Sequence, residues 1–420
     1  MTESDISLAP PSATSQDRLP FRLSLGIVLA FVIAPLTGNF ALLGKVLVGD
    51  VAVLLAICLL CLRVNLLLVR FDLRTFRQIP PLRWITALAL LGTASATLAY
   101  SYGPTDVFAR LRIVAFLALS FAVLFRASNP LFAKRVLTTY LALALVASVV
   151  VIVQVVWFRV TGGILAPDLS AIEVEPNSVF QAAKVNGEFR TGGLFREPSW
   201  FIVFVAPACF WFLRARSMLR SAIVTIGILL STSSLGLVVL LLEVVEAFVL
   251  RGKKKLRNGV IVVILAVLGA AAVTRIVPAS TERAAANLNG EGSITIRLFS
   301  PLLLVSNPAD WSFLGVNTSW MRGDSDNSED NWLDSAVYAV VLLGIPWAIL
   351  FYAALFKIAG PAGGIVLFTL ILFEGCIGRP DFWAAFAAFG IMRLLSSKVA
   401  LRSAVDSGRT HAVLSAVTST

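Results

Sequence analysis

A series of long apolar runs constrains this chain more than any other feature of its sequence. Crossing a bilayer takes about 17–25 apolar residues in a helix, because the ~30 Å hydrocarbon core offers the backbone no hydrogen-bonding partner. Several runs reach that length in a chain that is 58% hydrophobic and only 14% charged. The expected fold class is therefore an all-α polytopic membrane protein with about twelve transmembrane helices. The candidate spans are 22–38, 41–62, 84–101, 110–126, 136–158, 198–213, 258–278, 333–356, 362–376 and 382–396, with a longer apolar run at 221–249.

The positive charges lie mostly in segments on one side of these spans. With the N-terminus inside, the inner segments hold the arginines of 63–83 and the clusters RARSMLR at 214–220 and RGKKKLR at 251–257. Excess Lys and Arg in cytoplasmic loops sets the orientation of membrane proteins, so the net charge of +11 indicates topology and no nucleic-acid partner. The polar residues 1–20 lack the features of a signal peptide. Both termini are expected in the cytoplasm.

The run at 221–249 is long for one span and short for two. Basic clusters flank it on both sides, so a single crossing would place one cluster outside and invert every later loop. Its middle reads STSSLG at 231–236, a break of polar and small residues. We therefore expect two short helices, or a re-entrant pair, that turn near Ser231–Gly236. A single long kinked helix is the alternative.

Two outer segments, 159–197 and 279–332, are far longer than the ~2–8-residue connections usual between packed helices. Long loops on a rigid scaffold often carry binding and catalysis, so the chemistry is expected there. The chain is expected to divide into a disordered leader at 1–20, helices 1–5 at 21–158, an outer loop at 159–197, helices with the short hairpin at 198–278, a large outer loop at 279–332, C-terminal helices at 333–397 and a cytoplasmic tail at 398–420.

Few residues of this chain could support nucleophilic or metal chemistry. The single histidine, His411, lies in the expected cytoplasmic tail, which excludes a histidine-based triad and argues against a zinc site at the outer face. No Walker A pattern occurs. We therefore expect no metal and no cofactor. The four cysteines lie in or at the ends of spans: Cys58, Cys61, Cys209 and Cys376.

Arginines and carboxylates are the candidate functional groups of the first outer loop. Arg190, Arg196 and Glu197 precede the span that begins at Pro198. Guanidinium groups bind phosphate bidentately, so two outer arginines suit a pyrophosphate. Each arginine alone is equally explained as a surface anchor or an ion-pair partner. Glu197 and Pro198 are also typical of an ordinary helix start.

The second outer loop contains one arginine in an apolar stretch and one acidic cluster. Arg297 lies within ITIRLFSPLLL, where an unpaired charge is costly unless it faces a cavity. The cluster DSDNSEDNWLD at 324–334 includes Asp326 and Asp330. A solvated loop that caps the following span is the plain explanation of this cluster.

The segment RTGGLFREPSWF at 190–201 resembles the outer-loop motif of the bacterial O-antigen polymerase and O-antigen ligase superfamily. An apolar run interrupted by Ser and Thr, ILLSTSSLGLVVLLL, resembles the family's next landmark. The resemblance covers roughly residues 185–350. In the first motif the matching residues are Arg190, Gly193, Phe195, Glu197, Pro198 and Ser199. In the third landmark they are Arg297, Gly315, Asp330, Asn331 and Gly344.

This resemblance implies a glycan transferase of the bacterial inner membrane with two larger periplasmic loops. Members transfer a glycan from undecaprenyl pyrophosphate to an acceptor hydroxyl, without a metal or a nucleotide sugar. The implied partners are the lipid-linked glycan, the lipid bilayer, a flippase and a chain-length regulator. The acceptor needs a base, and a carboxylate with a raised pKa could serve. The candidate bases are Glu197, Asp326 and Asp330. The candidate pyrophosphate ligands are Arg190, Arg196 and Arg297, with Asn331 as a glycan contact.

One departure from the family pattern favours a polymerase over a ligase. The ligase branch has a histidine where this chain has Asp330. We therefore expect a polymerase of O-antigen, capsule or exopolysaccharide, with transfer to a lipid A-core acceptor as the closest alternative. A lipid-linked glycan transporter would need paired charges within spans. Its candidates are Lys45, Asp50, Glu243 and Glu246. The first two would form one pair, or both would lie near a membrane face with the lysine side chain extended to the surface. A scaffold without catalysis is the remaining alternative.

Overall fold

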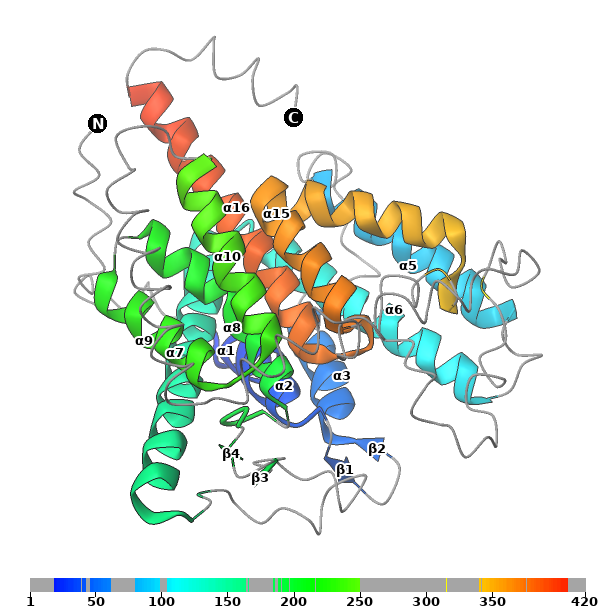
Figure 1. The fold of residues 1–420 in the computed structure, drawn as a ribbon. Coiled ribbons are helices and arrows are strands. Elements are labelled where there is room, and N and C mark those ends of the chain that lie inside the picture. Colours follow the sequence, from blue (N-terminus) through cyan, green and yellow to red (C-terminus); the bar gives the residue numbers. More distant parts are fainter. Residues whose placement is uncertain are drawn as a thin grey trace.

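The computed structural model is mostly helical (Figure 1), which confirms the expected class in outline. In the described part of the chain, strands occur only as two antiparallel pairs of two residues each, β1 with β2 and β3 with β4. The described residues are 19–38, 40–42, 46–61, 80–98, 104–163, 165, 184–185, 188–189, 191–195, 197–215, 217–249, 315, 340, 342–374 and 376–406.

Three of the described helices are long and apolar enough to cross a membrane, and they indicate a membrane protein by length and composition. They cover Val107–Arg126, Pro130–Thr161 and Ile345–Leu372. Shorter apolar helices cover Phe21–Leu36, Val48–Cys61, Pro198–Arg214 and Met218–Leu230. The count of about twelve crossings and the orientation stay predictions. All of 62–79, and all of 250–339 except Gly315, lie outside the described residues.

The N-terminal helices approach each other closely at glycines. A Cβ atom on Gly49 would lie 2.9 Å from the Cα of Gly38, and one on Gly26 would lie 3.0 Å from Leu60. Small residues let helix backbones pack closely in membrane proteins. The segment 21–36 therefore forms an antiparallel pair with α3. The elements here are α1 (Phe21–Val28), the π-helical η2 (Leu29–Ile33), α2 (Ala34–Leu36), β1 (Ala41–Leu42), β2 (Val46–Leu47) and α3 (Val48–Cys61).

Helix α7 is longer than the span expected at 136–158. It runs from Pro130 to Thr161, and 32 residues at 1.5 Å per residue give about 48 Å, well beyond a ~30 Å core. Asn129 caps its start, because its side-chain oxygen accepts a hydrogen bond from the Leu131 N–H at 2.9 Å. In its final turns, Phe158 stacks on Phe189, with ring centres 4.7 Å apart. Two helices precede it, α5 (Pro80–Leu98) and α6 (Pro104–Arg126).

Helix α8 (Pro198–Arg214) is the central helix of the described fold. Its residues from Phe201 to Ala206 are each 0% exposed, which is typical of a helix surrounded by others. It packs against α7, α9, α10, α15 and α16. Tyr140 of α7 donates its hydroxyl hydrogen to the Phe204 carbonyl. The first turn of α8 therefore belongs to a helix that is packed on all sides by other described helices.

Two helices with a turn between them occupy the apolar run at 221–249. α9 (Met218–Leu230) ends just before the expected break, and α10 (Ser234–Val249) begins within it. Thr232 has a positive φ of 57°, and the Ser231 hydroxyl donates to the Ile228 carbonyl at 2.7 Å. In Figure 1 the chain reverses direction at this turn. Whether the two helices cross a membrane stays a prediction.

Helix α15 (Ile345–Glu374) is broken in its middle. Gly360 has φ 77° and ψ 172°, a conformation that is essentially restricted to glycine, and Pro361 follows it. Figure 1 shows the ribbon turning sharply within α15. The break lies between the spans expected at 333–356 and 362–376. After α15, η8 (Cys376–Gly378) leads into α16 (Pro380–Asp406).

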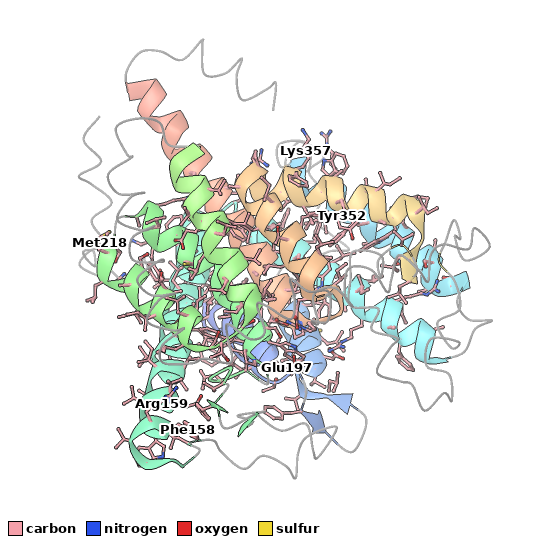
Figure 2. The ribbon with its side chains drawn as sticks, in the orientation of Figure 1. Phe158, Arg159, Glu197, Met218, Tyr352 and Lys357 are labelled. Carbon is pink, nitrogen blue, oxygen red and sulfur yellow. The ribbon has the colours of Figure 1, made fainter. Side chains whose placement is uncertain are left out.

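The two ends of the bundle differ. Figure 1 shows β1–β2 and the second pair, β3 (Lys184–Val185) with β4 (Glu188–Phe189), at the end opposite the C-terminal ends of α10 and α16. We call the end with these strands the strand end. Figure 2 places Glu197, Phe158 and Arg159 toward the strand end and Lys357 toward the opposite end. The predicted orientation would make the strand end the outer one.

Candidate functional site

Glu197 is the one predicted site residue that the structure describes. Two glycines of the third landmark, Gly315 and Gly344, are also described, with φ 88° and φ 90°. The other predicted site residues lie outside the described residues, so their positions relative to Glu197 stay predictions. They are Arg190, Arg196, Arg297, Asp326, Asp330 and Asn331.

Glu197 caps the start of the central helix. Its backbone is extended, and its carbonyl accepts the N–H groups of Trp200 at 3.1 Å and Phe201 at 3.2 Å. Ser199 donates its hydroxyl hydrogen to the Oε2 atom of Glu197 at 3.3 Å. The side chain is half-buried. A carboxylate at a helix N-terminus is stabilised by the helix dipole.

The glycine pair before Glu197 lets the chain fold tightly against the helices. A Cβ atom on Gly192 would lie 2.5 Å from the Glu197 carbonyl oxygen, far inside contact distance. Gly193 has φ 69°, and a Cβ atom there would lie 2.8 Å from Val151 of α7. Larger residues at either position would displace the segment. An ordinary helix start would account for Glu197 and Pro198, but it does not account for two glycines that must pack this closely.

One aromatic and one polar contact attach the same segment to α8 and α7. Phe195 is buried beside Phe204, with ring centres 5.0 Å apart. Thr191 donates its hydroxyl hydrogen to Gln154, a buried polar residue of α7, and accepts the Gly193 N–H at 2.9 Å. These contacts hold the described part of the motif in one conformation. In addition, Phe189 of β4 stacks on Phe158 with centres 4.7 Å apart.

A second charged cluster lies beside this segment, and sequence reasoning missed it. Arg379 donates to Glu374 at 3.0 Å and to both oxygens of Asp381 at 3.1 Å and 2.7 Å. Its guanidinium carbon lies 4.1 Å from the ring centre of Trp200. We call these four residues the Arg379 cluster. It joins the end of α15, the start of α16 and the first turn of α8.

Burial governs the electrostatics of the Arg379 cluster. Asp381 is fully buried, and Glu374 is 5% exposed. Burial raises the pKa of the Asp381 carboxyl, and the charge and hydrogen bonds of Arg379 oppose that shift. A signal for the cluster was present in the sequence, since Glu374, Arg379 and Asp381 stand within or beside a very short connection between two apolar spans. Trp200 could not have been assigned to it from spacing.

Other buried or half-buried charges pair between helices. Asp50 of α3 accepts a hydrogen bond from Arg112 of α6 at 2.8 Å, and a pairing of Asp50 with Lys45 stays a prediction. Lys45 itself lies outside the described residues. On α10, Glu246 accepts from Arg214 at 2.9 Å. One turn earlier, Glu243 accepts from the Cys209 thiol at 2.9 Å.

Within the described residues, no group of three or more His, Cys, Asp or Glu side chains is arranged to hold a metal ion. Around the first turn of α8, the described functional groups are the half-buried Glu197 carboxylate and the Arg379 cluster with its two buried carboxylates and the Trp200 ring. Comparisons with models of protein families, with curated proteins and with solved structures found no match to this chain.

Proposed function

We propose that this chain is a polymerase of the bacterial inner membrane. It joins undecaprenyl-pyrophosphate-linked oligosaccharide repeat units into a surface polysaccharide or exopolysaccharide at the periplasmic face. The proposal is supported by the joint order of the three motifs that resemble the O-antigen polymerase and ligase superfamily. The apolar helices and the absence of an outer histidine from the sequence agree with it.

The single observation that carries the proposal is the placement of Glu197. The described part of the motif, 191–195 and 197–199, is docked tightly on α7 and α8, and it holds a half-buried carboxylate at the start of a fully packed helix. Catalytic groups need positions fixed to within about 0.5 Å, which rigid elements provide better than loops. A loop that served only to join two spans would not need two glycines, a buried phenylalanine and a polar anchor in α7.

In the proposed reaction, Glu197 accepts the proton of an acceptor sugar hydroxyl. The hydroxyl oxygen forms a bond to the anomeric carbon of the donor glycan while the bond from that carbon to the phosphate oxygen breaks. Undecaprenyl pyrophosphate leaves with the bonding electron pair. Arg190, Arg196 and Arg297 are proposed to stabilise the charge that develops on it. Asp326 and Asp330 remain alternative bases.

The test uses the purified full chain in detergent with the lipid-linked repeat isolated from the producing host. A chelator is added, and nucleotide sugars are left out. A ladder of lengthening glycans supports the polymerase, and Arg190→Ala or Arg297→Ala is expected to abolish it in folded protein. Lysine at either position should rescue poorly, because it lacks the bidentate fork. A single transfer to a lipid A-core acceptor, without a ladder, would assign the ligase reaction instead.

A lipid-linked glycan transporter is the second candidate, because buried carboxylates lie between α8 and α10. Glu243 is 1% exposed, and such residues often mark transport pathways. However, Glu246 and its partner Arg214 lie in the last turns of their helices, where a basic residue also complements the helix dipole. Movement of an unaltered lipid-linked repeat across proteoliposomes, with no ladder, would favour the transporter.

A further inference from the structure

We propose that Arg379 is a positioning residue that holds the first turn of α8, and with it Glu197, through the ring of Trp200. The expected effect of Arg379 on the reaction rests on the proposed function, whereas its role in holding the helix turn rests on geometry alone. Arg379 lies in the connection between α15 and α16, far from Glu197 in sequence. It contacts α8 by stacking on Trp200, three residues after Glu197.

Hydrogen bonds that do not involve Trp200 hold the guanidinium group of Arg379 in place. Hydrogen bonds to Glu374 and to both oxygens of Asp381 fix its plane. A planar fork held at three points has little freedom left, so the stacking distance of 4.1 Å to Trp200 is determined by the ends of α15 and α16. A buried Arg with two carboxylates already bound also has little capacity to bind a phosphate. Arg379 therefore acts on its neighbours and not on the lipid pyrophosphate.

Movement of Trp200 would be transmitted to Glu197 over a short distance. The backbone N–H of Trp200 donates to the Glu197 carbonyl at 3.1 Å. The hydroxyl of the intervening Ser199 donates to the Glu197 carboxylate at 3.3 Å. On the opposite side of the segment, Gly192 lies close to the Glu197 carbonyl, since a Cβ atom at this position would be 2.5 Å from the carbonyl oxygen. Glu197 is thus held between the glycine pair and the Arg379 cluster.

This arrangement predicts that Trp200→Leu lowers kcat about tenfold and leaves KM within about threefold, because misplaced groups lose rate more than binding. The variant keeps every hydrogen bond of Arg379, so no carboxylate is left unpaired. Arg379→Lys, which keeps the charge but loses the fork, is expected to have a similar effect. The double variant should be no slower than the slower single variant, since both changes remove the same contact. Multiplied losses would contradict the proposal.

The matched control is Arg393→Lys. Arg393 also joins α16 to α15, but at the opposite end, where it donates to the Phe356 carbonyl at 3.1 Å. Its kcat per folded molecule is expected to stay within about twofold of the native value. A loss equal to that of Arg379→Lys would mean that any weakening of the α15–α16 pair slows the reaction, which overturns a specific role for Arg379.

A second measurement does not depend on activity. Glu197→Cys is introduced after the exposed Cys58 and the half-buried Cys61 are replaced by alanine, while the buried Cys209 and Cys376 stay. The maleimide labelling rate at position 197 is then compared with and without Trp200→Leu, against the protein without a cysteine at 197. We expect the rate to change at least about fivefold with Trp200→Leu and not with Arg393→Lys. An unchanged rate would overturn the positioning role. A changed labelling rate, together with no ladder from the native protein in the assay with the lipid-linked repeat, would retain that role and reject the polymerase.

Discussion

Two arginines join α15 to α16, and they differ in almost every other respect. Arg379 at the strand end is 14% exposed, binds two carboxylates and stacks on a ring of α8. Arg393 at the other end bonds only to backbone carbonyls near the Gly360 break. Carbonyls at a broken helix end attract any cation, whereas a two-carboxylate cage orients a guanidinium in one plane. The comparison separates an arginine that completes a helix end from one that organises the elements around the candidate site.

The largest effect is expected from Glu197, the carboxylate at the strand end that is proposed as the base. Glu197→Gln should lower the rate of ladder formation by about 10²–10⁴-fold, the range that general base catalysis contributes, with little change in folding. Glu246→Gln at the far end of the α8–α10 pair is the control and should change the rate by less than about threefold. Retained activity in Glu197→Gln, with loss in Asp326→Asn or Asp330→Asn, would transfer the base to the second loop.

Two glycines with similar backbone conformation, one in crowded and one in open surroundings, allow a steric test. Gly193 and Gly162 have nearly the same φ, 69° and 68°, but a Cβ atom on Gly162 would meet nothing within 4 Å. Gly162→Ala should therefore cost only the backbone strain, about 1–2 kcal/mol in thermal unfolding. Gly193→Ala adds a collision with α7 and should lower ladder formation per folded molecule more than about tenfold. Equal behaviour of the two variants would show that the docking of 191–195 is unimportant.

A smaller effect is expected at the polar anchor in α7. Gln154→Leu removes the partner of Thr191 and leaves a buried hydroxyl without it, so we expect a loss of about 1–3 kcal/mol and a several-fold slower reaction. Ser148→Ala, one to two turns earlier on the same helix, is the control. Its hydroxyl bonds only to Ala144 within α7 at 2.8 Å, so its loss should be below about 1 kcal/mol. Thermal melting in detergent and ladder assays measure both.

The smallest effect is expected from Arg393→Ala. It removes hydrogen bonds to partly exposed carbonyls, so stability should fall by about 1 kcal/mol or less, with an unchanged rate per folded molecule. Melting temperature and initial rate are the two measurements. A rate loss larger than that of Trp200→Leu would reverse the roles assigned to the two arginines.

Several local features were predictable from the sequence because their causes are local. The turn at 231–233 follows from a polar, small-residue stretch inside an apolar run, and the break at Gly360 from a Gly-Pro step. α8 starts at Pro198, because the fixed φ of proline suits the first turn of a helix. Helix lengths were less predictable. α7 exceeds the expected span at both ends, because its polar terminal residues are good helix formers with a cap at Asn129.

By itself, the sequence determined that the chain forms apolar helices and where several of them end, and it predicted arginines and carboxylates as the functional groups of the outer loops. Only the tertiary structure decided which charges are partners. Asp50 of α3 pairs with Arg112 of α6, and Arg379 reaches Trp200 from a segment far along the chain. The physical reason is that helix periodicity and turn chemistry act between neighbours in sequence, whereas ion pairs and ring contacts depend on how separate helices pack. The position of Glu197 between the glycine pair and the Arg379 cluster is a product of that packing.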